Sequence, residues 1–198
     1  MRPALGFAVL LTAGLLAAPT LAHADGFISP NVGVNFGGQA GGTLVNSVNN
    51  SNKISWGVAA GWMGAGVFGV EEDFAHSPSF FGSGGNIDSS RVVTLMTNAI
   101  IGVPVGGQHG GGIRPYAAIG VGWINQNIST LNGVGNFSEN DFGWDIGAGV
   151  MGYFADHIGL RADYRYFRNF QETGTNVIGL QVGHFNFNRV SVGVLFRF

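Results

Sequence analysis

The end of the chain alternates between apolar residues and polar or small residues with a period of two. From Arg189 to Phe198 the sequence reads Arg-Val-Ser-Val-Gly-Val-Leu-Phe-Arg-Phe. In an extended chain the valines and phenylalanines fall on one side, and the other side is polar or small apart from Leu195. The pattern recurs in about eight segments with almost no charge on the apolar side, which predicts strands. The segments are 29–37, 53–63, 66–76, 91–104, 113–125, 142–154, 157–170 and 187–198.

The predicted strands would present a surface that is too apolar for water. Charged residues make up only 10% of the 198-residue chain, whereas about a quarter is usual for soluble domains. The longest uncharged apolar stretch after the N-terminal segment, 57–70, is too short and too rich in glycine to span a membrane as a helix. A closed sheet is the remaining way to satisfy every backbone group in hydrocarbon. The sequence therefore predicts an all-β fold, an eight-stranded antiparallel up-and-down transmembrane β-barrel.

The connections between the predicted strands alternate in length. Long polar connections (38–52, 77–90, 126–141 and 171–186) would lie at one end of the barrel, and shorter ones (64–65, 105–112 and 155–156) at the other. Short periplasmic turns and long external loops are typical of Gram-negative outer-membrane barrels. Two aromatic belts are also expected. Trp56, Trp123, Trp144 and Tyr166 would form the belt near the loops, and Trp62, Phe68, Phe196 and Phe198 the belt near the turns.

The inward positions are predicted to be small, polar or ionised. Eight strands enclose a space that side chains just fill, so inward charges must pair across the interior and not line an open channel. We expect Asp163 to bridge Arg161 or Arg165 to the acids of the third and sixth strands. The predicted structural charge network comprises four acids and five arginines: Glu71, Asp73, Arg114, Asp145, Arg161, Asp163, Arg165, Arg189 and Arg197.

Glu72 departs from the alternation, because parity places this acidic side chain on the lipid face near the middle of its strand. An ionised side chain there would cost a few kcal/mol. A β-bulge that shifts the register is the favoured explanation. A protonated carboxyl and contact with a partner molecule are the alternatives.

The N-terminal segment has the features of a secretory signal peptide. Arg2 gives a positive start, 4–18 is apolar, and Ala22-His23-Ala24 supplies small residues for cleavage. The apolar stretch contains glycine and leads into Pro19, which disfavours a membrane anchor helix. We therefore expect a signal peptide at 1–24, an outer-membrane β-barrel at 25–198, and export across the inner membrane.

Several blocks of sequence resemble the small eight-stranded outer-membrane β-barrel family. This family includes the transmembrane domain of outer membrane protein A and the opacity-like surface antigens. The blocks are 69–74, 114–122, the Leu-Arg-Ala-Asp-Tyr-Arg-Tyr segment within 159–167, and the closing segment to Phe198. The resemblance implies that Phe198 is the signal read by the barrel assembly machinery. We also expect a monomer surrounded by outer-membrane lipid and lipopolysaccharide.

Neither composition nor motifs indicate catalysis, a cofactor or a metal. The chain has no cysteine, its histidines are not spaced as a helical metal-binding pair, and a net charge of −2 without a basic patch does not favour nucleic acid. We expect a structural and surface-interaction role, with the long loops contacting a host or surface ligand. A small porin-like channel is the alternative. A lipid A-modifying enzyme using His76, Ser77 and Glu72 or Asp73 is less favoured, as is a soluble ligand-carrying barrel.

Overall fold

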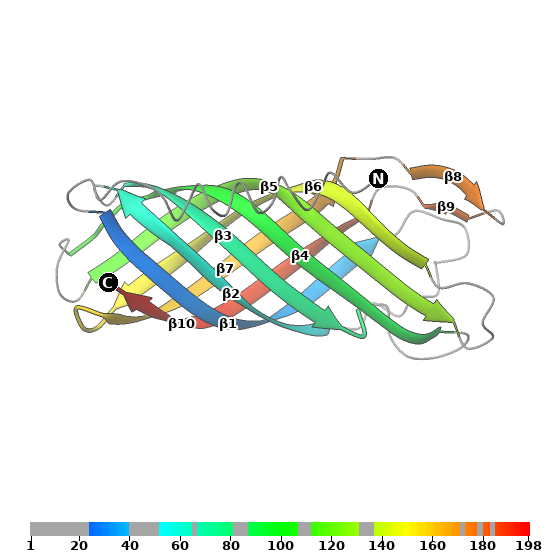
Figure 1. Ribbon diagram of the computed structural model, residues 1–198. Coiled ribbons are helices and arrows are strands. Elements are labelled where there is room, and N and C mark those ends of the chain that lie inside the picture. Colours follow the sequence, from blue (N-terminus) through cyan, green and yellow to red (C-terminus); the bar gives the residue numbers. More distant parts are fainter. Residues whose placement is uncertain are drawn as a thin grey trace.

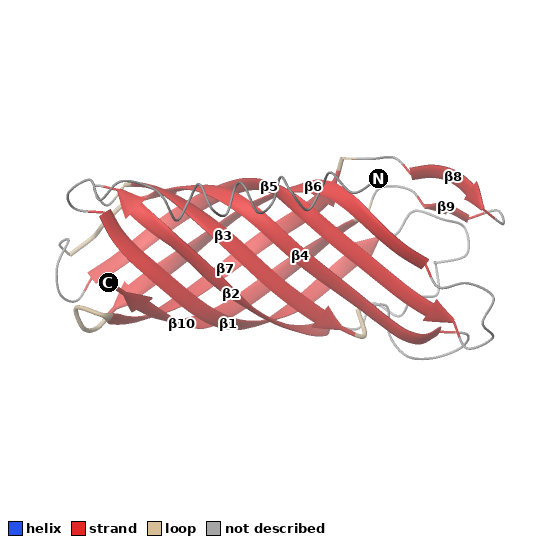
Figure 2. Ribbon diagram, viewed as in Figure 1, coloured by secondary structure: helices blue, strands red, loops and turns tan. Residues whose placement is uncertain are grey.

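A computed structural model describes residues 24–39, 52–64, 67–80, 87–106, 112–130, 137–170, 173–177, 180–182 and 185–198. The expected signal peptide lies outside these ranges, apart from Ala24. Among the described residues, no helix has the length and apolar character needed to cross a bilayer. The regular structure drawn in Figure 2 consists of strands.

Eight long antiparallel strands close into one barrel, so the predicted fold class is confirmed (Figure 1). Neighbours in sequence pair with each other, and the first and last strands pair to close the sheet. The strands of the barrel are β1 (Ala24–Gln39), β2 (Lys53–Gly64), β3 (Phe68–Pro78), β4 (Ile87–Gly102), β5 (Gly112–Thr130), β6 (Phe137–Tyr153), β7 (Ile158–Asn169) and β10 (Asn186–Arg197). A separate ribbon, β8 (Thr173–Val177) with β9 (Leu180–Val182), extends beyond one end of the barrel.

Several strands are longer than the alternation predicted, above all at the loop end. β5 and β6 remain paired as far as Ile128 opposite Phe137, so most of the predicted loop 126–141 is strand. Polar side chains occur on both faces of this extension, with Gln126 buried and Asn127 and Asn140 partly or fully exposed. A strand that projects beyond the membrane has no apolar face to maintain, which explains why periodicity did not detect it.

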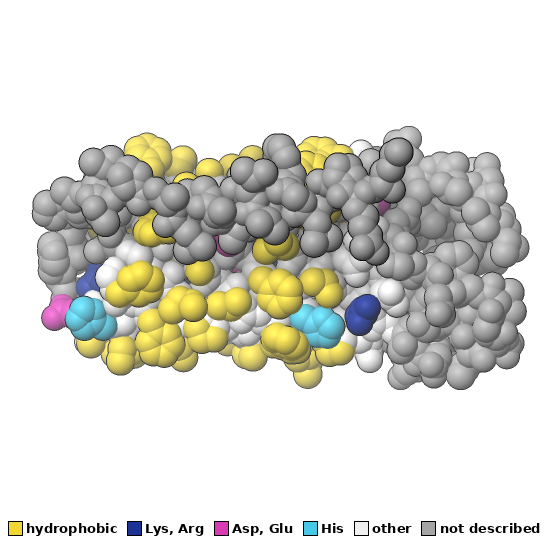
Figure 3. Space-filling view, in the orientation of Figure 1, with side chains coloured by type: hydrophobic (Ala, Val, Ile, Leu, Met, Phe, Trp, Pro, Cys, Tyr) yellow, Lys and Arg dark blue, Asp and Glu magenta, His cyan; other side chains and the backbone are white. Residues whose placement is uncertain are grey.

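The apolar face of every strand points outward. Figure 3 shows hydrophobic side chains gathered over the middle of one wall, with basic and histidine side chains nearer its ends. Aromatic side chains meet in pairs near the loop end, including Trp123 with Phe142 and Trp144 with Tyr166, at centroid distances of 6.1 and 5.7 Å. Val32, Ile119 and Leu160 are each more than half exposed, as expected of a surface that faces acyl chains.

The core lies inside the barrel and includes two apolar layers. The turn-end layer consists of Phe27, Met63, Ile100, Tyr116, Ala118, Met151, Tyr153 and Leu195. The loop-end layer consists of Phe80, Val92, Met96, Ile124, Phe167, Phe185 and Phe187. The expectation of small, polar or ionised inward residues was therefore wrong near both ends of the lumen. An eight-stranded interior has to be filled by side chains, and large apolar residues fill it where no charges pair.

Candidate functional site

A cluster of charged side chains occupies the lumen between the two apolar layers. It is called the lumen cluster here and consists of Glu71, Asp73, Asp145, Arg161, Asp163, Arg165 and Arg189, all at most 9% exposed. These residues come from β3, β6, β7 and β10. On β7 the residues at 161, 163 and 165 share the inward face because alternate residues of a strand point the same way.

Glu71 and Asp163 each bind the same two arginines. Glu71 accepts from Arg161, and from Arg165 with a distance of 2.5 Å between Oε1 and Nη2. The two Asp163 oxygens accept from the Nε atoms of Arg161 and Arg165, both at 3.1 Å. Arg165 also donates from Nη1 to Asp145 Oδ2 at 3.0 Å. The structure thus brings together Asp163, both arginines and the acids Glu71 and Asp145 of the third and sixth strands.

Arg189 and Asp73 form a further ion pair of the lumen cluster, on β10 and β3. Arg189 Nη2 donates to Asp73 Oδ1. The Arg189 guanidinium also lies over the Phe167 ring, 4.8 Å from its centroid, so the pair adjoins the loop-end apolar layer. A cation held over an aromatic face in a desolvated site is attracted by the ring quadrupole.

Glycines beside the cluster make room for its side chains. Asn98, Gly120 and Asp145 lie in one row across β4, β5 and β6. Asn98 Oδ1 and Asp145 Oδ1 both reach the space over Gly120 that a Cβ would occupy. Neither oxygen has a hydrogen-bond partner in the described structure. Asp145 is therefore held by one arginine through a single oxygen, unlike Glu71 and Asp163.

Arg114 and Arg197, which were predicted to belong to the same network, lie near the turn end. Their guanidinium carbons are 5.7 and 4.5 Å from the centroid of the Tyr153 ring. Arg197 Nε also donates to the Asp156 carbonyl at 2.8 Å. The nine predicted charges thus form two groups at different depths, because parity specifies a face and not a depth.

Phe80, an aromatic residue in the predicted connection 77–90, packs inside the loop end of the barrel. Phe80 follows Ser79, a non-glycine residue with φ of 54°, and is buried inside the barrel mouth. Its ring packs edge-on against Phe185 and Phe187, with centroids 5.7 and 5.2 Å away. Phe81, Leu131 and Ile178, which fall in the predicted long loops, lie outside the described residues.

The His, Ser and acid considered for lipid A chemistry do not converge. His76 faces outward beside Trp56, with ring centroids 5.2 Å apart. Ser77 faces the lumen, where its hydroxyl oxygen accepts from Asn35 Nδ2 at 2.6 Å. The barrel wall separates the two side chains. Within the described ranges, no group of three His, Cys, Asp or Glu side chains could hold a metal ion.

The register around Glu72 is continuous, so the bulge that we expected there is wrong. Glu72 lies opposite Ala60 on β2 and Thr97 on β4 without a shift in either ladder. Its side chain is partly exposed on the outer face. Thr97 Oγ1 donates to Glu72 Oε1 at 2.7 Å. The Glu72 side chain therefore points outward without a register shift, and its hydrogen-bond partner is Thr97 on the neighbouring strand β4.

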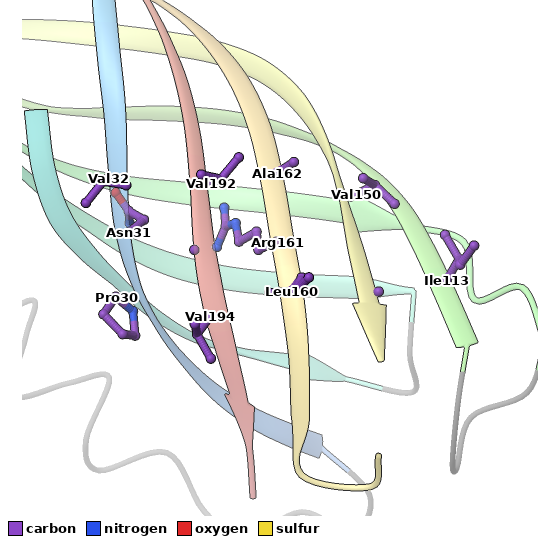
Figure 4. A pocket seen from close by; sticks show the side chains of 12 residues that line it. Pro30, Asn31, Val32, Ile113, Val150, Leu160, Arg161, Ala162, Val192 and Val194 are labelled. Carbon is purple, nitrogen blue, oxygen red and sulfur yellow. The ribbon is translucent and has the colours of Figure 1, made fainter. Parts of the chain in front are cut away.

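The seam between β1 and β10 is interrupted near a groove on the outer wall. Pairing passes from Ile28 opposite Phe196 to Asn31 opposite Gly193, without pairs at Ser29 and Pro30. Proline has no N–H to donate to a ladder. The groove measures about 840 Å³ and is lined mainly by apolar side chains, including those of Leu160, Val192 and Val194. Figure 4 shows these residues on β7 and β10, with Pro30 on β1 beside them.

An eight-stranded barrel with an apolar outer face and a plugged interior defines the class of outer-membrane barrel proteins. The outer membrane protein beta-barrel domain family matches residues 8–198. The chain belongs to this family.

Solved structures with similar folds are small outer-membrane barrels. Neisserial surface protein A is 14% identical, with a TM-score of 0.65 over 89% of this chain and 99% of that one. OprG from Pseudomonas aeruginosa is 12% identical, with a TM-score of 0.61 over 89% and 96%. Ail, the attachment invasion locus protein of Yersinia pestis, is 13% identical, with a TM-score of 0.57 over 89% and 99%. These likenesses concern the fold. No curated protein matches the sequence.

Proposed function

We propose that this protein is an envelope barrel of the Gram-negative outer membrane that acts through surface contacts and performs no catalysis. The observation that carries the proposal is the plugged interior, in which the lumen cluster lies between two apolar layers. A barrel filled in this way offers its surfaces, and not its lumen, to other molecules. The loops at the end opposite the short turns are the surface proposed for contact.

One structural neighbour supports this class of function. Ail is named as an attachment invasion locus protein, and one structure shows it in complex with sucrose octasulfate, a heparin analogue. We propose that the loops of the present chain likewise bind a host or surface ligand.

Comparison of cells with and without the protein tests the proposal. Intact cells that carry it are expected to adhere more strongly to surfaces coated with sulfated polysaccharide or matrix protein. The matched control keeps the barrel and replaces 43–50 and 131–136 with Gly-Ser segments of equal length. Adhesion that is the same for cells with and without the protein on every surface tested would count against the proposed role.

Electrical recordings separate this proposal from the runner-up, a small porin-like channel. The purified barrel in planar bilayers is expected to show no steady conductance, because paired charges and two apolar layers fill the lumen. Recordings from the same detergent without protein provide the baseline. Large and reproducible current steps would favour the channel.

We further propose that residues 1–24 are a cleaved signal peptide, with Asp25 as the first residue of the exported protein. The intact mass of protein extracted from outer membranes tests the cleavage position. Phe198 is proposed as the residue read by the barrel assembly machinery, and the surrounding lipid is proposed to include lipopolysaccharide. The Phe198 backbone completes the barrel at the turn end by exchanging hydrogen bonds with Gly26 at 3.0 and 2.9 Å.

A further inference from the structure

Glu72 forms a polar spot on an otherwise apolar wall. Among the described residues, it is the only acidic or basic side chain that faces outward between the two aromatic belts. Thr97, a second polar side chain on that face, lies directly opposite it and donates the hydrogen bond described above. Two polar residues that meet across neighbouring strands form a single local feature of the lipid-facing surface.

The depth of this feature follows from the neighbouring strand. On β2, Trp56 lies opposite His76 near the loop end and Trp62 lies opposite Val70 near the turn end. Ala60, opposite Glu72, falls between these two tryptophans. Because tryptophans of a membrane barrel lie at the two interfaces, the carboxyl lies between these interfaces, at the depth of the hydrocarbon.

The local hydrogen bond satisfies only part of the carboxyl group. A carboxyl offers about four acceptor positions when ionised, and a donor with the remaining acceptors when protonated. Thr97 supplies one donor, and Oε2 has no partner in the described structure. An ionisable group at this depth marks a functional contact by default, because lipid tails cannot supply the missing partner.

We propose that this spot is an intramembrane contact between two copies of the chain, in place of the monomer expected from the sequence, with the Glu72 carboxyls meeting across a two-fold axis. A protonated carboxyl both donates and accepts, so it is complementary to an identical carboxyl. In a two-fold contact the same patch lies on both sides, which provides that match. The small residue Ala60 lies opposite Glu72 on β2, and Ala99, opposite Val70, lies two residues from Thr97 on the same face of β4. Small side chains let membrane-spanning surfaces approach closely.

Cysteine crosslinking in isolated outer membranes tests the contact, because the chain has no cysteine of its own. With Ala60→Cys, a short bismaleimide is expected to give a covalent dimer. The matched control is Ala162→Cys, which replaces an outward alanine on β7, four strands from Glu72 on β3 around the barrel. This control is expected to give little dimer. Equal crosslinking at both positions, or none at Ala60→Cys, would overturn the proposal.

Two substitutions of Glu72 in the Ala60→Cys background identify the chemistry of the partner. Glu72→Leu is expected to lower the crosslinked fraction about tenfold, which corresponds to about 1.4 kcal/mol. Glu72→Gln is expected to retain most of the dimer, because an amide also donates and accepts. Loss of the dimer in both variants would point to a cationic partner and overturn the proposal. Unchanged crosslinking in Glu72→Leu would do so too. The heat-dependent shift in gel mobility verifies that each variant has folded.

Discussion

Glu71→Ala is expected to lower the free energy of unfolding by about 3–5 kcal/mol. Glu71 is fully buried on β3 and accepts hydrogen bonds from both Arg161 and Arg165 on β7. Its removal leaves two buried guanidinium groups short of an acceptor at the centre of the lumen. Urea titration of the refolded barrel in lipid vesicles, followed by tryptophan fluorescence, measures the change.

Two further substitutions in the lumen cluster show whether the effect arises from paired charges. Asp163→Asn is expected to be strongly destabilising, because both of its oxygens accept from arginine. Asp145→Asn is expected to cost much less, because only one Asp145 oxygen binds an arginine. Equal losses in the two variants would contradict an electrostatic origin.

The faces of the strands could be predicted from sequence because the side-chain period of a strand is two. Parity placed Glu71, Asp163 and Arg189 inward and Val32, Ile119 and Leu160 outward, as the structure does. This inference needs no knowledge of the neighbouring strands. The assignment of faces applies to the part of each strand that lies within the membrane, where one face has to be apolar.

Depth and pairing inside the lumen could not be predicted in this way. Whether Arg197 meets Asp163 or the Tyr153 ring depends on the stagger between strands, which one sequence does not reveal. The inward burial of Phe80 depends on the turn at Ser79 and on two phenylalanines about a hundred residues later in the chain.

The position of Glu72 was also predicted wrongly. The expectation of a bulge assumed that an outward acid must be a register error, whereas the ladders on both sides are regular.

Gly193→Val is expected to destabilise the barrel by about 1–3 kcal/mol, the usual cost of overpacking. Gly193 lies on β10 beside the interrupted part of the seam, opposite Asn31 on β1. A Cβ added there would lie 2.6 Å from the Pro30 carbonyl oxygen and 2.9 Å from Ser29 Oγ. The Pro30 oxygen belongs to the backbone, so relief requires β1 to move away from β10 where the ladder already lacks pairs.

The same substitution at Gly152 provides the control for Gly193→Val. Gly152 lines the outer groove, and a Cβ there would meet only the Leu160 carbonyl oxygen, at 4.0 Å. Gly152→Val is therefore expected to fold with nearly unchanged stability, whereas Gly193→Val should unfold at lower urea concentration and give less heat-resistant barrel on gels. If both valines had the same effect, the cost would come from replacing glycine in a strand, and the close approach at the seam would not limit closure. A selective loss at Gly193 would instead show that closure of this barrel depends on a glycine where Pro30 leaves the first and last strands without paired residues.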